Sequence, residues 1–282
     1  MACIFCTFVE SANLTMDIQY FMKNISLFAF LLAIAFISSA KQQNNPSTYE
    51  ESPIQFTELS ANLMQAVIDG ESTADYRAEL EKVSLKTLSK QLDNDLKKKA
   101  FWINVYNAHI QIFLKENPDL YDDRGAFFKT KRINIAGEML SFDDIEHGII
   151  RGSRSKLTLG YTKKLFVPKF ERKLRCDKRD GRIHFALNCG AKSCPKVAVY
   201  HADRMDEQLD AISKQFLNTV TEIEGNTVRT TTLFSWFRGD FGGLDGVEDF
   251  LKKYQIIPQD MDPNIEFKKY DWTLYLNNYT EI

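Results

Sequence analysis

The segment from Asp95 to Glu116 is the sequence feature that most constrains how this chain can fold. It reads DLKKKAFWINVYNAHIQIFLKE and is followed by Asn117-Pro118, a pair that ends helices. Apolar residues recur along it at helical spacing, and further apolar and aromatic side chains cover much of its remaining surface. A helix that is apolar nearly all round is buried in a protein core. We therefore expect a central, buried helix over residues 95–116.

Three amide side chains of this segment, Asn104, Asn107 and Gln111, fall on one helical face. A buried amide must find hydrogen-bond partners or cost about 1–3 kcal/mol, so these side chains need partners. In one interpretation Asn104 and Asn107 bind substrate in a cleft beside Trp102 and Tyr106. In the other, the amides hold the backbone of neighbouring loops. The sequence leaves both interpretations open, and Asn104, Asn107 and Trp102 are candidate substrate-binding residues.

Shorter elements are predicted around this helix. Helical spacing and capping residues predict helices over 56–68, 80–92, 141–151, 203–220 and 246–254. Alternation and turn residues predict a hairpin over 131–140 and strands over 182–188, 227–232 and 266–276. Helices and strands are intermixed without regular βαβ alternation. We therefore expect an α+β fold, a single domain with a central buried helix packed on a small mixed or antiparallel sheet.

The N-terminal region is expected to lie outside this domain. The stretch 22–40 reads MKNISLFAFLLAIAFISSA, with a basic start, a 13-residue apolar run and small residues at its end. The run is too short to cross a ~30 Å bilayer comfortably, and the pattern predicts a secretory signal peptide cleaved after Ala40. A genuine N-terminal membrane anchor is the alternative. We interpret 1–21 as preceding the true start at Met22, and 41–55 as a disordered lead-in. The mature protein is thus expected to be secreted or periplasmic, without stable membrane insertion.

Size and charge limit the classes of function. The chain has 282 residues, 44% of them hydrophobic, which suffices for one core. No repeat or linker divides residues 56–282, so we expect one domain there. Basic and acidic residues number 36 and 38, which gives a net charge of −2. Nucleic-acid binding needs positive charge gathered on one face, so we expect no nucleic-acid partner.

Removal of the signal peptide would leave three cysteines, Cys176, Cys189 and Cys194, so at least one stays free or pairs between chains. The last two lie in HFALNCGAKSCP (184–195), and an extracytoplasmic compartment permits a disulfide between them. Cys189 has three possible roles: a disulfide or inert burial, a reactive thiol, or metal ligation. The metal set, H-x4-C-x4-C from His184, matches no standard zinc spacing. We therefore expect no metal and no cofactor.

A reactive Cys189 would need a base within hydrogen-bond reach and a group that orients that base. The backbone N–H groups of Gly190 and Ala191 are candidates to stabilise a thiolate or an oxyanion. Alternation along the predicted strand 182–188 turns His184 away from Cys189, so His184 is not the expected base.

The predicted helix over 141–151 supplies better candidates. His147 points away from its apolar face and is free to face a cleft. Glu146 borders that face, where burial would raise its pKa. The candidate catalytic residues are therefore Cys189, His147 and Glu146. His184 and Asp240, the latter from the aromatic turn FSWFRGDF, complete the candidate substrate-binding set.

Four stretches also carry a resemblance to a known family: FWINVYNA (101–108), LSFDDIEHGIIR (140–151), IHFALNCGAKSCP (183–195) and YDWTLYLN (270–277). Together they resemble the domain of unknown function 547 family over about 96–276, and the signal peptide would make this a secreted bacterial-type member. The resemblance implies that the position of Cys189 matters more to the family than that of Cys194, which is often serine in plant relatives. This weakens a disulfide between them as the family-wide explanation. The resemblance implies no established activity.

Two functions of different classes remain. The first is a thiol-dependent hydrolase or acyltransferase that acts on a small molecule or peptide. In it Cys189 is the nucleophile, His147 the base, and Glu146 or Asn107 the orienting group. The alternative is a non-catalytic binding or scaffold domain, in which the loop from Cys189 to Cys194 is a structural staple.

Overall fold

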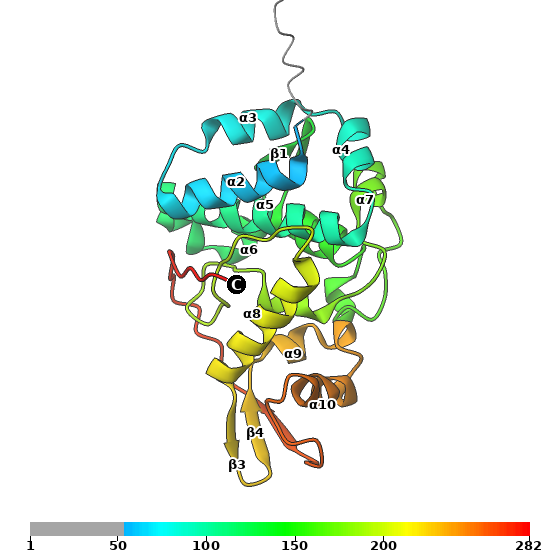
Figure 1. The fold of residues 1–282 in the computed structure, drawn as a ribbon, viewed down its shortest axis with the longest axis vertical. Coiled ribbons are helices and arrows are strands. Elements are labelled where there is room, and N and C mark those ends of the chain that lie inside the picture. The colour runs from blue at the N-terminus through cyan, green and yellow to red at the C-terminus, as the bar shows by residue number, and fades with distance from the viewer. Residues whose placement is uncertain (1–53) are drawn as a thin grey trace, which may run out of the picture. The chain divides into compact units, whose positions relative to one another are not determined.

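Helix α5 (Asp95–Glu116) has the bounds expected from the sequence and lies in the interior of the fold (Figure 1). The Asn94 side chain caps its start by accepting a hydrogen bond from the Lys97 N–H at 3.1 Å. Every residue from Lys98 to Ile112 is buried. The expected central buried helix is therefore confirmed.

A computed structural model describes residues 54–282, which form one compact unit. The expected signal peptide, the start at Met22 and nearly all of the expected lead-in lie outside the described residues. None of the helices in this described part is long and apolar enough to cross a membrane.

Short elements surround α5. The other helices of the described residues are α2 (Phe56–Asp69), α3 (Ala74–Lys82), α4 (Leu85–Gln91), α6 (Arg124–Lys129), α7 (Lys169–Leu174), α8 (Met205–Val220), α9 (Leu233–Trp236) and α10 (Leu244–Lys253). Short 3-10 turns cover Pro118–Tyr121, Lys156–Thr158, Gly181–Phe185 and Arg238–Asp240, and a π-helix covers Asp144–Ile150. The strands are β1 (Ile133–Ile135), β2 (Glu138–Leu140), β3 (Glu222–Glu224), β4 (Thr227–Thr230) and β5 (Asn264–Phe267).

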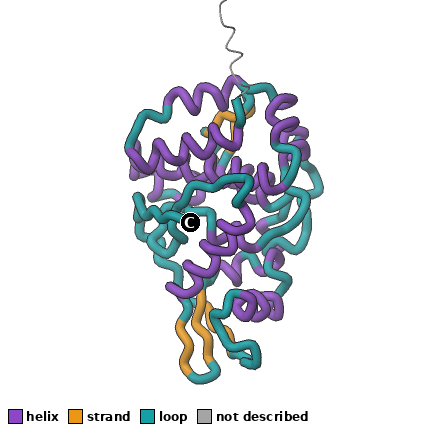
Figure 2. The backbone as a smooth tube through the Cα atoms, viewed as in Figure 1, coloured by secondary structure: helices purple, strands orange, loops and turns teal. Residues whose placement is uncertain are grey.

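Helices enclose α5, and the strands lie in two separate small sheets (Figure 2). Helix α2 packs along α5, while α8 contacts both α5 and the Gly181–Phe185 turn. Strands β1 and β2 form an antiparallel hairpin, as expected. Its turn residues Ala136 and Gly137 have φ of 55° and 74°, the left-handed pair that matches the twist of a two-residue hairpin. In the second sheet β4 pairs antiparallel with β3 and parallel with β5. The fold is thus an α+β single domain with a small mixed sheet.

Predictions of secondary structure failed in three places. Of the expected closing strands over 266–276, only Glu266 and Phe267 lie in a strand, β5. The expected helix over 80–92 is interrupted, because the Ser84 side chain accepts a hydrogen bond from the Thr87 N–H at 3.0 Å and starts α4 anew. The expected strand over 182–188 is instead a 3-10 turn followed by an irregular segment. The Asp180 carboxylate accepts a hydrogen bond from the Arg182 N–H at 3.1 Å and so favours a turn there. Because that strand does not form, the alternation of side chains along a strand does not determine the direction of His184.

The segment before the π-helix begins with a capping box. The Ser141 hydroxyl accepts a hydrogen bond from the Asp144 N–H at 3.1 Å, and the Asp144 carboxylate accepts one from the Ser141 N–H at 3.0 Å. The helix then widens, so that the Arg151 N–H bonds to the Glu146 carbonyl five residues earlier. A π-helix re-aims side chains and is frequent at functional sites.

Replacement of Ser141 by alanine should lower the free energy of unfolding by about 1 kcal/mol, since the first turn loses its cap. Urea unfolding followed by circular dichroism measures this as a lower transition midpoint. Ser155→Ala is the matched control, because Ser155 precedes a turn without capping it through its side chain. Equal midpoints for the two variants would contradict the assigned role of the cap.

Candidate active site

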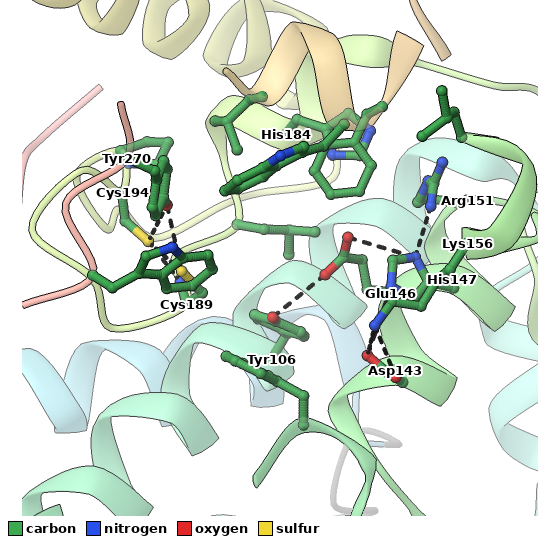
Figure 3. A pocket seen from close by; sticks show the side chains of 18 residues that line it. Tyr106, Asp143, Glu146, His147, Arg151, Lys156, His184, Cys189, Cys194 and Tyr270 are labelled. Atoms are coloured by element: carbon green, nitrogen blue, oxygen red, sulfur yellow. Dashed lines mark hydrogen bonds and ion pairs between the residues drawn. The ribbon is translucent and has the colours of Figure 1, made fainter. Parts of the chain in front are cut away.

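One pocket of about 380 Å³ gathers most of the titratable side chains that the sequence singled out (Figure 3). Its walls come from α5, the π-helix, the 3-10 turns at 156–158 and 181–185, α9, and the segment near the C-terminus. The lining includes Tyr106, Glu146, His147, Arg151, His184, Cys189, Cys194, Trp236, Tyr270 and Trp272. All three candidate catalytic residues therefore face one cavity.

Cys189 lies on one side of the pocket, next to the thiol of Cys194 and the hydroxyl of Tyr270. Its Sγ lies 2.7 Å from the Sγ of Cys194 and 3.5 Å from the hydroxyl of Tyr270, and both cysteines are free thiols. Hydrogen bonding from the Cys194 thiol, then from Tyr270 and the Ala191 N–H, lowers the pKa of Cys189 although burial opposes this. Burial instead raises the pKa of Cys194. Cys189 is thus the more acidic thiol of the pair, and Cys194 donates a hydrogen bond to it.

The backbone N–H groups of Gly190 and Ala191, expected to stabilise a thiolate or an oxyanion, have different partners. The Ala191 N–H helps to stabilise the Cys189 sulfur. The Gly190 N–H is taken up by the side-chain oxygen of Asn188 at 2.8 Å, so it is not free to bind an oxyanion. Gly190 itself has φ of 88°, and an added Cβ would lie 2.9 Å from Leu114, so this tight turn requires glycine.

Glu146 occupies the middle of the site. In the view of Figure 3 its carboxyl lies between the two cysteines and His147. The Tyr106 hydroxyl donates a long hydrogen bond of 3.5 Å to it, and the Nδ1 of His147 is 3.6 Å away. Burial raises the pKa of Glu146 to about 7 despite the nearby Arg151. The expected rise is present, and it places this carboxyl where it can both donate and accept a proton near neutral pH.

His147 is held in a single protonation state. Arg151 can only donate, so its contact of 2.7 Å makes the Nδ1 of His147 an acceptor and leaves the proton on Nε2. That Nε2 lies 3.6 Å from the carboxylate of Asp143. Burial, with the Arg151 charge, lowers the pKa of His147 well below its usual value. The imidazole is therefore neutral, and its one lone pair is occupied.

The expected contact between Cys189 and a histidine is not formed. Within the described residues, the hydrogen bonds of the Cys189 thiol go to Cys194 and Tyr270. His147 lines the same pocket from its other side (Figure 3). Because Arg151 occupies the lone pair of His147, Glu146 is the better placed group for proton transfer.

His184 lines the pocket, and Asp240 lies behind it. The Asp240 carboxylate accepts hydrogen bonds from the Nε2 of His184 at 2.9 Å and from the Nε of Arg151 at 2.5 Å. The His184 ring also stacks on Phe237 at 3.7 Å, and both rings line the pocket. Asp240 is not part of the pocket lining, so the expectation that it contacts substrate is corrected. Its carboxylate instead holds the side chains of His184 and Arg151. Its ion pair is with Arg151, not with its neighbour Arg238.

The amides of α5 hold loops and do not line the pocket. Asn107 accepts a hydrogen bond from the Asn188 N–H and donates one to the Ala186 carbonyl, both at 2.9 Å. Asn104 does the same for the N–H and carbonyl of Tyr200, at 2.9 and 2.8 Å. Both amides are completely buried, as is Trp102. The structure thus does not bring these three candidate substrate-binding residues to the cavity, and the loop-holding interpretation describes the two amides.

Several pocket residues were missed by sequence reasoning. Tyr270 and Trp272 form an aromatic group with Trp236, with ring centroids 4.6–5.6 Å apart. Tyr270 and Trp272 belong to the quoted stretch YDWTLYLN, and Arg151 ends LSFDDIEHGIIR, so the motifs contained them without indicating a role. In residues 54–282, no three His, Cys, Asp or Glu side chains are grouped to hold a metal ion.

Comparison with known proteins bears on the same segment. No curated protein and no solved structure matches this chain. Residues 89–217 match the family described as "Protein of unknown function, DUF547". The matched range spans α5, the π-helix and both pocket cysteines, so the candidate site is built largely from the family's own segment. This match supports the resemblance to the domain of unknown function 547 family that the four sequence stretches carry.

Proposed function

We propose that this protein is a thiol-dependent hydrolase or acyltransferase, with Cys189 as nucleophile and Glu146 as the proton-transfer group. The observation that carries the proposal is one cavity that holds a thiol of lowered pKa and a carboxyl whose pKa is raised to about 7. Oppositely shifted groups in one cleft are typical of acid–base and nucleophilic sites.

The proposed reaction has two steps. The Cys189 thiolate attacks an acyl carbonyl and forms a thioester, while the protonated Glu146 gives its proton to the leaving group. In the second step the Glu146 carboxylate removes a proton from water or from an acceptor alcohol or amine, which attacks the thioester. The acyl product leaves, the Cys189 sulfur is released as thiolate, and Glu146 is again protonated.

His147 has a positioning role in this scheme. Its protonation state is set by Arg151 on one side and Asp143 on the other, and it lies against the Glu146 carboxyl. The network continues from Arg151 to Asp240. This differs from the Cys–His pair expected from the sequence, in which His147 accepts the proton directly.

The substrate is an unknown small molecule or peptide with an acyl group. The cavity walls include the exposed Trp236 and the half-buried Tyr270 and Trp272, which favour an apolar or planar portion beside the acyl carbon. We also propose that the chemistry takes place outside the cytoplasm, on the signal-peptide pattern of residues 22–40.

Labelling of the native protein with iodoacetamide, mapped by mass spectrometry, tests the nucleophile. Cys189 should react at least tenfold faster than Cys176 at neutral pH, since thiolate and access control the rate. Cys176 is an internal control, because it is buried and burial raises its pKa to about 12. The Cys189→Ser variant should lose the fast-labelled site.

The same measurement separates the competing function. A structural staple is favoured by the proximity of Cys189 and Cys194, and by the hydrogen bond from the Cys189 N–H to the Cys194 sulfur at 3.0 Å. A native protein in which Cys189 labels as slowly as Cys176, or is recovered as a disulfide, would refute the thiol-dependent enzyme.

A further inference from the structure

The segment 154–168, called here the basic loop, carries large apolar side chains that pack against almost nothing. Leu157, Leu165 and Phe166 are 95%, 93% and 90% exposed. Among the other large apolar side chains of the described residues, none is more than about half exposed. Single exposed apolar residues are ordinary, but three nearly bare ones in one loop mark a contact surface.

Positive charge is concentrated on the same segment and on the helix that follows it. Residues 154–173 contain seven basic residues and one acidic residue, Glu171, in a chain whose net charge is −2. Lys163 is exposed, as are Lys169, Arg172 and Lys173 of α7. Within the described residues, these four side chains form no ion pair. They are therefore available to a negatively charged partner.

The basic loop is held in place by its backbone, so the exposure is a property of an anchored segment. The Ser155 N–H bonds to the Thr162 carbonyl at 2.9 Å, and the Gly239 N–H bonds to the Leu159 carbonyl at 3.0 Å. Gly160, with φ of 87°, packs so closely on the Arg151–Asp240 pair that an added Cβ would lie 2.7 Å from the Asp240 carboxylate. The fold thus fixes the base of this loop and leaves its apolar side chains in water.

We propose that the basic loop docks the protein on a lipid surface that carries anionic headgroups. Leucine and phenylalanine side chains gain free energy at the boundary of headgroups and acyl chains, while nearby lysines and arginines attract anionic lipids. A nucleic acid or an acidic protein would satisfy the charges but would leave Leu157, Leu165 and Phe166 without a specific purpose. The combination of charge and bare apolar side chains favours the lipid surface.

Docking would also set the position of the pocket. Lys156 and Leu159 belong to the basic loop and line the cavity that holds Cys189. A loop held against lipid headgroups therefore keeps one wall of the cavity near the lipid surface. This inference does not depend on the proposed chemistry, since the docking contacts involve neither Cys189 nor Glu146.

Flotation of the full chain with lipid vesicles tests the proposal. Binding to vesicles of equal parts phosphatidylglycerol and phosphatidylcholine should exceed binding to phosphatidylcholine alone, and should weaken as salt is added. The charge-reversal variant Lys163→Glu/Lys169→Glu should bind the anionic vesicles at least tenfold more weakly. The matched control Lys214→Glu/Lys269→Glu changes two exposed lysines of other segments and should bind as the unsubstituted chain does.

A probe in the loop itself makes the test independent of any lipid affinity of the N-terminal apolar stretch. Tryptophan placed by Phe166→Trp should show added quenching by brominated phosphatidylglycerol, whereas Ile223→Trp, at a 46% exposed position, should not. No added quenching at position 166, or equal binding by the charge-reversal and control variants, would overturn the proposal. Near-ultraviolet circular dichroism establishes that each variant is folded.

Discussion

Replacement of Asp240 by asparagine is expected to lower the free energy of unfolding by about 3–5 kcal/mol. The side chains of Arg151 and Asp240 are only 2% and 3% exposed, and their ion pair spans 2.5 Å. Loss of the negative charge leaves the Arg151 guanidinium as an uncompensated buried charge and weakens the hydrogen bond that the His184 N–H donates to residue 240. Urea unfolding at neutral pH measures the loss, and Asp260→Asn, at an exposed aspartate, is the control.

The pH dependence of the same pair has a defined sign. Burial alone would raise the pKa of Asp240, but its bonds to His184 and Arg151 outweigh burial and hold the pKa below the usual 3.8. Its stabilisation is therefore complete above about pH 4 and is lost as the pH falls through the folded pKa. The double variant Arg151→Met/Asp240→Leu should recover most of the stability, since it removes both charges together. No difference between the single and double variants would contradict this account.

Local signals in the sequence predicted the elements whose causes are local. The periodicity and capping of residues 95–116 predicted α5 to the residue, and the Ala136-Gly137 pair marked the hairpin. The strand expected over 182–188 failed because side-chain bonds from Asp180 compete with an extended backbone. Predictions from strand propensity and from apolar alternation take no account of such side-chain hydrogen bonds.

The candidate site was only partly predictable, because its geometry depends on contacts between distant segments. Cys189, Glu146 and His147 were identified by residue type and context, and they do share one pocket. Their relations were not predictable: Arg151 takes the lone pair of His147, and Tyr270 reaches the cysteines from 76 or more residues away.

The charge of the whole chain concealed a local feature. A net charge of −2 argued against polyanion binding, yet residues 154–173 hold a surplus of basic residues. An average over the chain cannot reveal such a segment, whose importance rests on which side chains are exposed and unpaired. Which side chains of this segment are exposed could be established only from the structure.

Replacement of Glu146 by glutamine is expected to abolish most turnover while making the protein more stable above neutral pH. With p-nitrophenyl acetate as acyl donor, the variant should still acylate Cys189, because this leaving group needs no acid. Hydrolysis of the thioester should slow by about 10²–10⁴-fold, since the general base is lost. The unsubstituted protein should hydrolyse faster as the pH rises through about 7, and the variant should lose that inflection. Glu138→Gln, at an exposed position, is the control.

The stability change has the opposite sign to the change in activity. The folded pKa of Glu146 is about 7 and its ordinary value is 4.5, so between these values the folded state holds a proton that the unfolded state releases. Stability therefore falls as the pH rises from 4.5 to about 7 and stays reduced above it. At about 1.4 kcal/mol for each pH unit, the penalty approaches about 3 kcal/mol. Glutamine cannot ionise, so urea unfolding at pH 8 should show the variant as more stable, with little difference at pH 4.

Both results together distinguish an active-site residue from a structural one. If Glu146 only supported the fold, its replacement would destabilise the protein. The hydrolysis rate of the unsubstituted protein would then show no inflection with pH. A group that weakens the fold and yet sustains turnover is expected at sites where pKa is shifted for catalysis. Equal hydrolysis rates in Glu146→Gln and the unsubstituted protein would exclude Glu146 as the proton-transfer group. His147, which faces the same cavity, would then be the remaining candidate among the sequence-predicted residues, after release of its Nδ1 by Arg151.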